Sequence, residues 1–242
     1  MIDLHCHLLP KLDDGARSDE EAIALARYAV ENGITHSVLT PHINPGHYDN
    51  DLAGIETAHR RFRQLLQQHD CPLNTTYAAE VRICPELINM QASHCLPFLG
   101  RWQGQQVLLL ELPHSHIPAG TEQVIHWLLS QQILPLVAHP ERNRDILADY
   151  RKATWLKSQG CLFQVTAGAF CGRFRSQVKQ VAEQLLADGL IHLVASDAHN
   201  LERRPPDLRE GYAAVERLAG VQTADNLFKR HPWQIISHRF DE

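Results

Sequence analysis

The sequence predicts an α/β fold in which seven buried parallel strands close into a (β/α) barrel with helices outside it. Short apolar runs alternate with amphipathic helical patterns along the whole chain, which is typical of a parallel sheet. Nearly every apolar run ends in a histidine, aspartate or glutamate, whereas an open sheet would gather such residues at one switch point. The chain has 242 residues, of which 44% are hydrophobic, and we expect a single domain over residues 1–242.

The apolar runs follow one another from the beginning of the chain to its end. Six of the seven finish on side chains that bind metals, and the run at 163–166 does not. The runs occupy residues 2–7, 38–42, 77–80, 108–111, 136–139, 163–166 and 193–199. Because the carboxyl ends of barrel strands meet at one mouth, we expect the metal-binding side chains to converge there.

Amphipathic helices are expected between these runs. Ser18 and Glu21 form a capping box, and the apolar face that follows ends at Gly33. Two more helices, over residues 208–219 and 223–230, are expected near the end of the chain. Other helical faces are marked by Leu52, Ile55, Phe62, Leu65 and Leu66, by Val124, Ile125, Leu128 and Leu129, and by Val178, Val181, Leu185 and Leu186.

The composition argues against several classes of protein. The formal net charge of -5 at pH 7 comes without the basic stripe that marks a nucleic-acid-binding surface, so no nucleic-acid partner is expected. No apolar run is long enough to span a bilayer, and the first residues lack the charged and apolar regions of a signal peptide. The six cysteines include no Cys-x-x-Cys pair. We therefore expect a cytoplasmic protein, not itself membrane-spanning, with reduced cysteines.

The first and last runs carry pairs of candidate metal ligands. His5 and His7 are two residues apart, so on an extended strand both side chains point to the same face and can bind one ion. Asp197 and His199 repeat this spacing at the end of the last run. Packed core histidines are the alternative, and the position of both pairs at strand ends favours metal binding.

Two glutamates extend the set of candidate ligands. Glu80 and Glu111 follow apolar residues, where an unpaired carboxylate is costly to bury and a cation removes that cost. Nitrogen and oxygen ligands without thiolates suit manganese, iron or zinc, and the set is large enough for two or three divalent ions. Clustered ions acidify a bound water and neutralise phosphoryl oxygens, and the same hydroxide could cleave amides or esters. The sequence therefore predicts a metal-dependent enzyme.

Two arginines indicate the kind of substrate. Arg142 lies three residues after His139, and Arg204 lies five residues after His199, which places both on loops at the expected mouth. A guanidinium matches two phosphate oxygens and gains little from a neutral amide, so these arginines favour a phosphoryl substrate. The alternative is that both are surface ion-pair residues.

Six short motifs occur in the order of a known family. They are Met1-Ile2-Asp3-Leu4-His5-Cys6-His7, Asp13-Asp14-Gly15, Thr40-Pro41-His42, Glu80-Val81-Arg82, His139-Pro140-Glu141-Arg142-Asn143-Arg144 and Ala195-Ser196-Asp197-Ala198-His199-Asn200. With them the chain resembles the bacterial protein-tyrosine phosphatases of the PHP superfamily that are encoded with capsular and exopolysaccharide genes. The similarity covers essentially the whole chain, and the last two motifs are the specific ones.

The resemblance implies a distorted seven-stranded (β/α) barrel with a trinuclear site, in which a metal-bound hydroxide attacks phosphotyrosine. We expect two or three divalent ions, manganese before iron or zinc. Arg142 and Arg204 match phosphate-binding arginines of the family. The matching metal ligands are His5, His7, Asp14, His42, Glu80, Glu111, His139, Asp197 and His199. Asp14 follows from the resemblance alone, since it lies in the loop after the first run.

The resemblance also implies a partner, a membrane-associated tyrosine kinase of polysaccharide export whose phosphotyrosines would be the substrate. The segment around His114 and His116 contains more histidine than the family leads us to expect, and we place His116 at the substrate entrance. A phenol has a pKa near 10, so a tyrosyl leaving group departs without strict need of a general acid. The residues nominate no such acid.

Cys95 and Arg101 have the Cys-x5-Arg spacing of cysteine-dependent phosphatases. That chemistry needs a reactive thiolate in a loop whose backbone amides converge on phosphate. The bulky residues between Cys95 and Arg101 suit such a loop poorly, and a short match of this kind is readily coincidental. We expect Cys95 to have no part in the reaction.

Three other functions compete with tyrosine phosphatase. A histidinol-phosphate phosphatase, or another small-molecule phosphoesterase of the superfamily, would share the metals and the arginines. A C–N hydrolase is less favoured, because many of those barrels use a carbamylated lysine at a strand end and no lysine lies at one here. A catalytically silent metal-binding or kinase-docking module would need fewer ligands.

Overall fold

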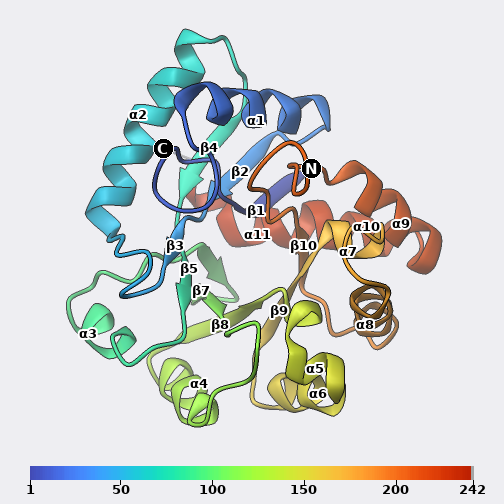
Figure 1. Cartoon of the computed structure of the whole chain (residues 1–242). Coiled ribbons are helices and arrows are strands. Elements are labelled where there is room, and N and C mark those ends of the chain that lie inside the picture. Colours follow the sequence, from blue (N-terminus) through green and yellow to red (C-terminus); the bar gives the residue numbers. More distant parts are fainter. Residues whose placement is uncertain (241–242) are drawn as a thin grey trace.

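The computed structural model describes residues 1–240 and places the strands at the centre of the molecule, with helices around them (Figure 1). The predicted α/β fold with a parallel sheet and outer helices is confirmed. The strands are β1 (Ile2–Cys6), β2 (His36–Leu39), β3 (His42–Ile43), β4 (Asn74–Tyr77), β5 (Glu80–Arg82), β6 (Gly100–Trp102), β7 (Gln105–Glu111), β8 (Ile133–Ala138), β9 (Leu162–Thr166) and β10 (Leu193–Ala195).

The strands form two sheets that are parallel except at one hairpin. The smaller sheet has the order β1-β2-β4, and the larger one has the order β10-β9-β8-β7-β5-β3. β6 pairs antiparallel with β7. The larger sheet follows the order of the chain, except that β4 lies in the smaller sheet and β6 lies off the main path. Because the pairing along this path is parallel, its strands deliver their carboxyl ends to the same side of the molecule.

Two of the predicted strands are each divided into two. The run 38–42 becomes β2 and β3, and the run 77–80 becomes β4 and β5. The first part of each run pairs within the smaller sheet and the second part within the larger one. Backbone hydrogen bonds continue across the break, from Ala78 N to Leu39 O at 2.9 Å and from Glu80 N to Pro41 O at 3.1 Å. The two sheets are therefore continuous through these two runs.

The first and last strands also meet. Cys6 forms a parallel bridge with Ala198, just after β10. His7 N donates to Ala198 O at 2.8 Å, and Asp197 N donates to His5 O at 2.8 Å. These bonds place the end of β1 directly beside the end of β10, although the two strands are almost the whole chain apart.

Helices occupy the expected intervals. Ser18 caps the first of them by accepting from Glu21 N, while the Glu21 carboxylate accepts from Arg17 N and not from Ser18 N. The α-helices are α1 (Asp19–Glu31), α2 (Leu52–Gln68), α3 (Leu87–Ala92), α4 (Thr121–Ser130), α5 (Arg144–Ala148), α6 (Arg151–Ser158), α7 (Ala167–Phe170), α8 (Ser176–Ala187), α9 (Arg209–Ala219), α10 (Val221–Asp225) and α11 (His231–Ile236). The 3₁₀ helices η1 (Pro140–Arg142) and η3 (Ser237–Arg239) and the π-helix η2 (Asn226–Arg230) complete the set.

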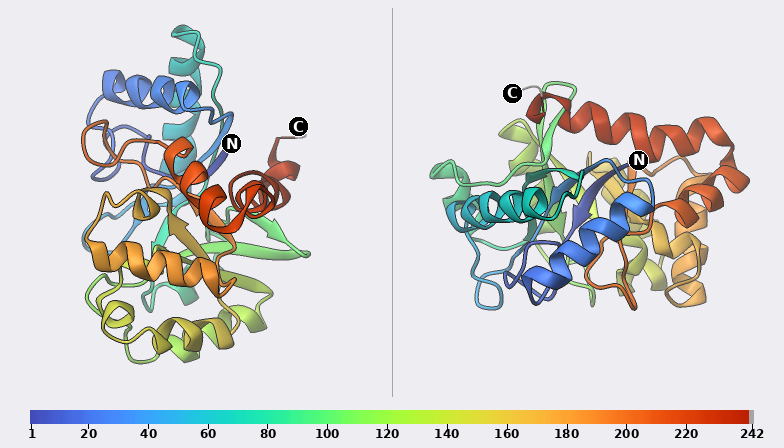
Figure 2. Two further views of the ribbon diagram at one scale, coloured as in Figure 1. Left: turned by 90° about the vertical axis from the view of Figure 1, so that its right-hand side faces the viewer. Right: turned by 90° about the horizontal axis from the view of Figure 1, so that it is seen from above.

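Successive strand residues face two different hydrophobic clusters, as the two-residue period of a strand requires. Val107 and Leu109 belong to an inner cluster, and Leu108 belongs to a larger cluster that lies against the helices. Ile235 and Ile236 of α11 are fully buried in the inner cluster. Figure 2 (left) shows α11 and the loop after β10 on opposite sides of the molecule. α11 therefore closes the strands at the end away from the candidate ligands.

Several short elements have no counterpart in the sequence prediction. They include the β6 strand, α3, α5, α7 and α11, none of which is longer than six residues. Segments of that length hold at most two helical turns, so their apolar residues show no usable period. Within residues 1–240, no helix has both the length and the apolar character needed to cross a bilayer.

Candidate metal centre

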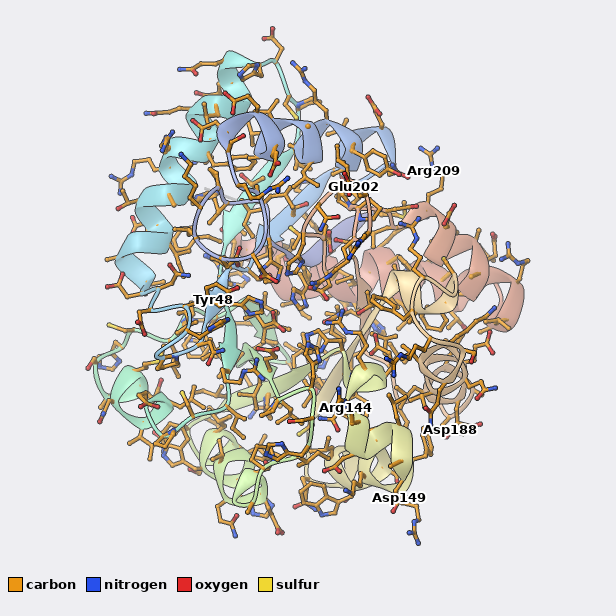
Figure 3. The ribbon with its side chains drawn as sticks, in the orientation of Figure 1. Tyr48, Arg144, Asp149, Asp188, Glu202 and Arg209 are labelled. Carbon is orange, nitrogen blue, oxygen red and sulfur yellow. The ribbon has the colours of Figure 1, made fainter. Side chains whose placement is uncertain are left out.

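The structure brings the nine candidate metal ligands together at the carboxyl ends of the strands. His5 lies in β1, His42 begins β3, Glu80 begins β5 and Glu111 ends β7. The other five follow strands in the chain: His7, Asp14, His139, Asp197 and His199. Figure 3 shows Tyr48, Glu202 and Arg144 on different sides of the central region in which side-chain nitrogen and oxygen atoms gather.

Eight of the nine fall into three groups whose ligand atoms lie within 4.8 Å of one another. The groups are His7, Asp14, His42 and His199; His5, His7, Glu80 and Asp197; and His42, Glu80 and Glu111. Each pair of groups shares one residue, so the three form a linked triangle. His139 completes the cluster, because its Nε2 lies 2.7 Å from Glu80 Oε1.

Hydrogen bonds at Nδ1 fix the orientation of three imidazole rings in the cluster. His5 Nδ1 lies 2.8 Å from Gln164 Oε1, and His7 Nδ1 lies 2.6 Å from Asp13 Oδ2. His199 Nδ1 lies 3.0 Å from the backbone oxygen of Asp197. Each of these oxygens accepts the Nδ1 proton, so Nε2 is the ring nitrogen that faces the cluster. Outer partners of this kind orient metal-binding histidines in proteins generally.

The inward-facing atoms fit positively charged ligands better than they fit one another. His5 Nε2 and His7 Nε2 lie 3.2 Å apart, so if both rings were neutral and protonated at Nδ1, two lone pairs would face each other. Burial alone lowers the pKa of His7, but Asp13, Asp197 and Glu80 together raise it well above its usual value. A positive charge between these nitrogens is therefore favoured, and either a proton or a bound cation could supply it.

The buried carboxylates point to the same conclusion. Burial and the neighbouring Glu80 raise the pKa of Glu111 to about 9. Within residues 1–240, Glu80 Oε2, Glu111 Oε2 and Asp197 Oδ1 are buried and make no hydrogen bond. Glu80 Oε2 nevertheless lies 3.1 Å from both His5 Nε2 and His42 Nδ1. Buried acceptors without donors are costly, and cations bound by nitrogen and oxygen ligands would satisfy all of them.

Asp197 connects the ligands to the two arginines nominated from the sequence. Its Oδ1 faces the histidines, whereas its Oδ2 lies 2.7 Å from Nη2 of both Arg142 and Arg204. Burial alone raises the pKa of Asp197, and the two arginines lead the groups that hold it well below its usual value. Both arginines are thus in contact with the cluster, and the carboxylate with which they pair is buried.

Arg82 brings a third guanidinium to the cluster. Its Nη2 lies 3.0 Å from Glu111 Oε2, and its side chain is 22% exposed. Arg82 belongs to the Glu80-Val81-Arg82 motif, but nothing in the sequence alone assigns it a function. Its place at the end of β5, two residues after Glu80, puts it on the same face of the strand as that ligand.

A cavity of about 180 Å³ opens over the cluster. Three arginines, Arg82, Arg142 and Arg204, line it together with ligand residues. His47, Tyr48 and His114 form part of its wall, and the Tyr48 ring stacks on that of His42 with centroids 5.3 Å apart and planes 9° apart.

The placement of the two extra histidines differs from the prediction. His114 lines the cavity, with its ring centroid 5.1 Å from that of His139. His116 does not line it, and its ring nitrogen instead contacts Ser115 Oγ at 2.8 Å. The turn that carries both residues directs His114 and not His116 toward the cluster.

Two candidate ligands have unusual backbone geometry, and one glycine permits a close approach between backbone segments. His139 and Asp197 follow β8 and β10 with φ of 35° and 52°, in the left-handed region that L-residues rarely adopt. Strain of this kind, about 1–3 kcal/mol per residue, typically persists at functional sites. Gly15 lies against His7, the residue after β1, and a Cβ there would be 2.1 Å from His7 O. Only glycine lets the loop with Asp13 and Asp14 approach the strand so closely.

Two supporting residues were missed by the sequence prediction. Asp13 Oδ2 accepts from His7 Nδ1 and, at 3.0 Å, from His42 N. Gln164 lies in the one run interpreted as silent, 163–166, yet it orients His5. The only signal was a polar residue inside an apolar strand: Gln164 is fully buried, and such an amide needs a specific partner.

The residues that a cysteine-dependent phosphatase would need lie outside the candidate metal centre. Cys95 is exposed, and Leu96 and Leu99, between it and Arg101, are buried in hydrophobic clusters. The segment is therefore packed and does not form an open loop around phosphate. The three groups of candidate metal ligands in residues 1–240 contain no cysteine.

Comparison with known proteins agrees with the geometry. The chain is 36% identical over 222 residues to tyrosine-protein phosphatase YwqE of Bacillus subtilis, covering 92% of this chain and 86% of that protein. It is 27% identical to tyrosine-protein phosphatase CpsB of Streptococcus pneumoniae, covering 98% of each.

The fold of the chain is also similar to that of a solved structure. That structure comes from crystal structures of YwqE and CpsB described as unique metal-dependent tyrosine phosphatases, and it matches with a TM-score of 0.86 and 35% identity over 93% of this chain and 90% of that one. The family model for capsular polysaccharide synthesis, CpsB/CapC, matches residues 1–237. The chain therefore belongs to the CpsB/CapC family of capsular polysaccharide synthesis.

Proposed function

We propose that this protein is a metal-dependent protein-tyrosine phosphatase, an enzyme that hydrolyses phosphotyrosine. The observation that carries the proposal is the buried cluster of imidazoles and carboxylates beside a cavity lined by arginines. The relatives named tyrosine-protein phosphatase support it, since the similarity to them extends over nearly the whole chain.

The proposed metal ligands are the nine residues predicted from the sequence, and the linked triangle of groups favours three divalent ions over two. Nitrogen and oxygen donors without thiolates favour manganese, with iron or zinc as alternatives. Divalent ions in such a site lower the pKa of water and offset the charge of phosphoryl oxygens. The ligands are His5, His7, Asp14, His42, Glu80, Glu111, His139, Asp197 and His199.

The remaining side chains would bind and position the substrate. Arg142 and Arg204 present guanidinium donors to phosphoryl oxygens from the Asp197 side of the cavity. Tyr48, backed by His42, offers an aromatic wall for the phenyl ring of phosphotyrosine. Because a phenolate leaves readily, the scheme assigns no general acid.

The fold proposal is a distorted seven-stranded barrel in one domain over residues 1–242. Three features support the barrel: the continuity of the two sheets through the divided runs, the bridge between Cys6 and Ala198, and an inner cluster separate from the outer one. In this interpretation β2 with β3 is one barrel strand, and β4 with β5 is the next.

The proposed partner is a bacterial tyrosine kinase of polysaccharide export, met in the cytoplasm, whose phosphotyrosines are the substrate. The match to the capsular polysaccharide synthesis family supports a role in that process. No nucleic-acid partner is proposed, because the net charge is -5.

The test compares a phosphotyrosyl peptide with histidinol phosphate as substrates of the manganese-loaded protein. We expect a clear preference for the peptide in kcat/KM, and a Glu80→Ala variant that loses both bound metal and turnover. A preference for histidinol phosphate would show a small-molecule phosphoesterase instead. Bound metal with background turnover on both substrates would show a silent metal-binding module.

A further inference from the structure

Arg82, like Arg142 and Arg204, contacts a carboxylate of the cluster while part of its guanidinium has no hydrogen-bond partner in the described part of the chain. In each arginine, Nη2 lies close to an oxygen of a ligand carboxylate: 2.7 Å for Arg142 and Arg204 on Asp197, and 3.0 Å for Arg82 on Glu111. In each, Nε is also buried and has no hydrogen-bond partner among residues 1–240. All three side chains line the same cavity.

The contact between Arg82 and Glu111 does not account for the whole guanidinium. Arg204 makes an aligned hydrogen bond to Asp197, whereas Arg82 Nη2 is close to Glu111 Oε2 without the alignment of a hydrogen bond. Arginines that hold a carboxylate frequently use two parallel N–H bonds. The N–H groups of the Arg82 guanidinium can therefore donate to another acceptor in the cavity.

We infer that Arg82 is a third phosphate-binding arginine, which donates to a non-bridging phosphoryl oxygen from the Glu111 side of the cavity. Arg142 and Arg204 act from the Asp197 side, so the phosphoryl group is held between them and Arg82. The ligand class is a phosphomonoester dianion, or the inorganic phosphate that remains after hydrolysis. The inference rests on the proposed function, because it concerns the same cavity.

The test measures binding of inorganic phosphate to the manganese-loaded protein by titration calorimetry. The variants are Arg82→Ala, Arg82→Lys and Arg82→Gln, and the control is Arg101→Ala, which removes an exposed arginine from β6. Loss of a charge-assisted hydrogen bond weakens binding by about ten- to a hundredfold. We expect losses of this size for Arg82→Ala and Arg82→Gln, a smaller loss for Arg82→Lys, and no change for Arg101→Ala.

The Arg82→Gln variant separates phosphate binding from support of Glu111, because its amide can still lie beside that carboxylate. Metal content and melting temperature are measured on every variant. Wild-type phosphate affinity in loaded Arg82→Ala and Arg82→Gln would overturn the inference. Loss of metal from all three Arg82 variants would also overturn it, since Arg82 would then support Glu111. Failure of the proposed function is distinct, because it would appear as absent peptide hydrolysis by the wild-type protein.

Discussion

Replacing Asp13 by asparagine should disable the metal centre although Asp13 is not itself a proposed ligand. Asp13 Oδ2 accepts from His7 Nδ1 at 2.6 Å and from His42 N at 3.0 Å, and Oδ1 accepts from Gly15 N at 2.9 Å. An amide has one acceptor oxygen in place of two. Whichever way the amide is turned in the Asp13→Asn protein, an N–H group faces at least one of these three donors.

The size of the effect follows from the bonds that are lost. A hydrogen bond to a charged group is worth about 1.5–3 kcal/mol, which corresponds to about ten- to a hundredfold in binding. Loss of the bond to His7 frees its ring to take the other tautomer, in which Nε2 carries a proton and cannot bind a cation. Removal of such an outer partner typically costs about 10–100-fold in metal affinity or activity. We expect a decrease of that size for Asp13→Asn in both quantities.

The assay is a manganese titration of the metal-free protein, followed by bound metal and by kcat/KM on a phosphotyrosyl peptide at each manganese concentration. Asp149→Asn is the matched control, because Asp149 pairs with Arg151 at the surface. Excess manganese should partly rescue the Asp13→Asn protein. Wild-type metal affinity and activity in that protein would refute the claim that Asp13 orients His7.

Three further outcomes are expected. Gly15→Ala should yield protein with less bound metal, measured by metal analysis, since its Cβ would collide with His7 O; a wild-type metal content would contradict this. Cys95→Ser should leave kcat/KM on the phosphopeptide unchanged, because Cys95 is exposed and outside the ligand groups; a large loss would restore the cysteine mechanism. Ile236→Ala should lower the free energy of unfolding by about 2–5 kcal/mol in denaturant titration, because Ile236 is fully buried. Since α11 closes the far end, that variant should keep its metal content, and a proportional loss of metal would argue against separate roles for the two ends.

The sequence predicts where the strands end better than it predicts which neighbours they pair with and where they are interrupted. Hydrophobic period and a terminal candidate ligand locate the run 108–111, which becomes the end of β7, and the run 136–139, whose His139 directly follows β8. The division of 38–42 and 77–80 has no local signal, because it arises from pairing with different neighbours on the two sides of the break. α11 was not predicted for a similar reason, since its six residues are fixed by packing against the strands and not by helical period.

The candidate ligands were easier to predict than the residues that support them. A histidine or carboxylate at the end of an apolar run is conspicuous, because burying it without a partner is unfavourable. Asp13 and Gln164 gain their roles only through contacts with His7 and His5, which the fold creates. The left-handed conformations of His139 and Asp197 were likewise invisible, since they are imposed by the turns after β8 and β10.

Metal analysis of the purified protein tests the central claim most directly. After saturation with manganese and removal of free ions, we expect two to three ions per chain, loss of phosphotyrosine hydrolysis on chelation, and its return when manganese is added back. Fewer than one ion per chain, or undiminished turnover by the chelated protein, would contradict the assignment of the buried histidines and carboxylates as a polynuclear metal centre.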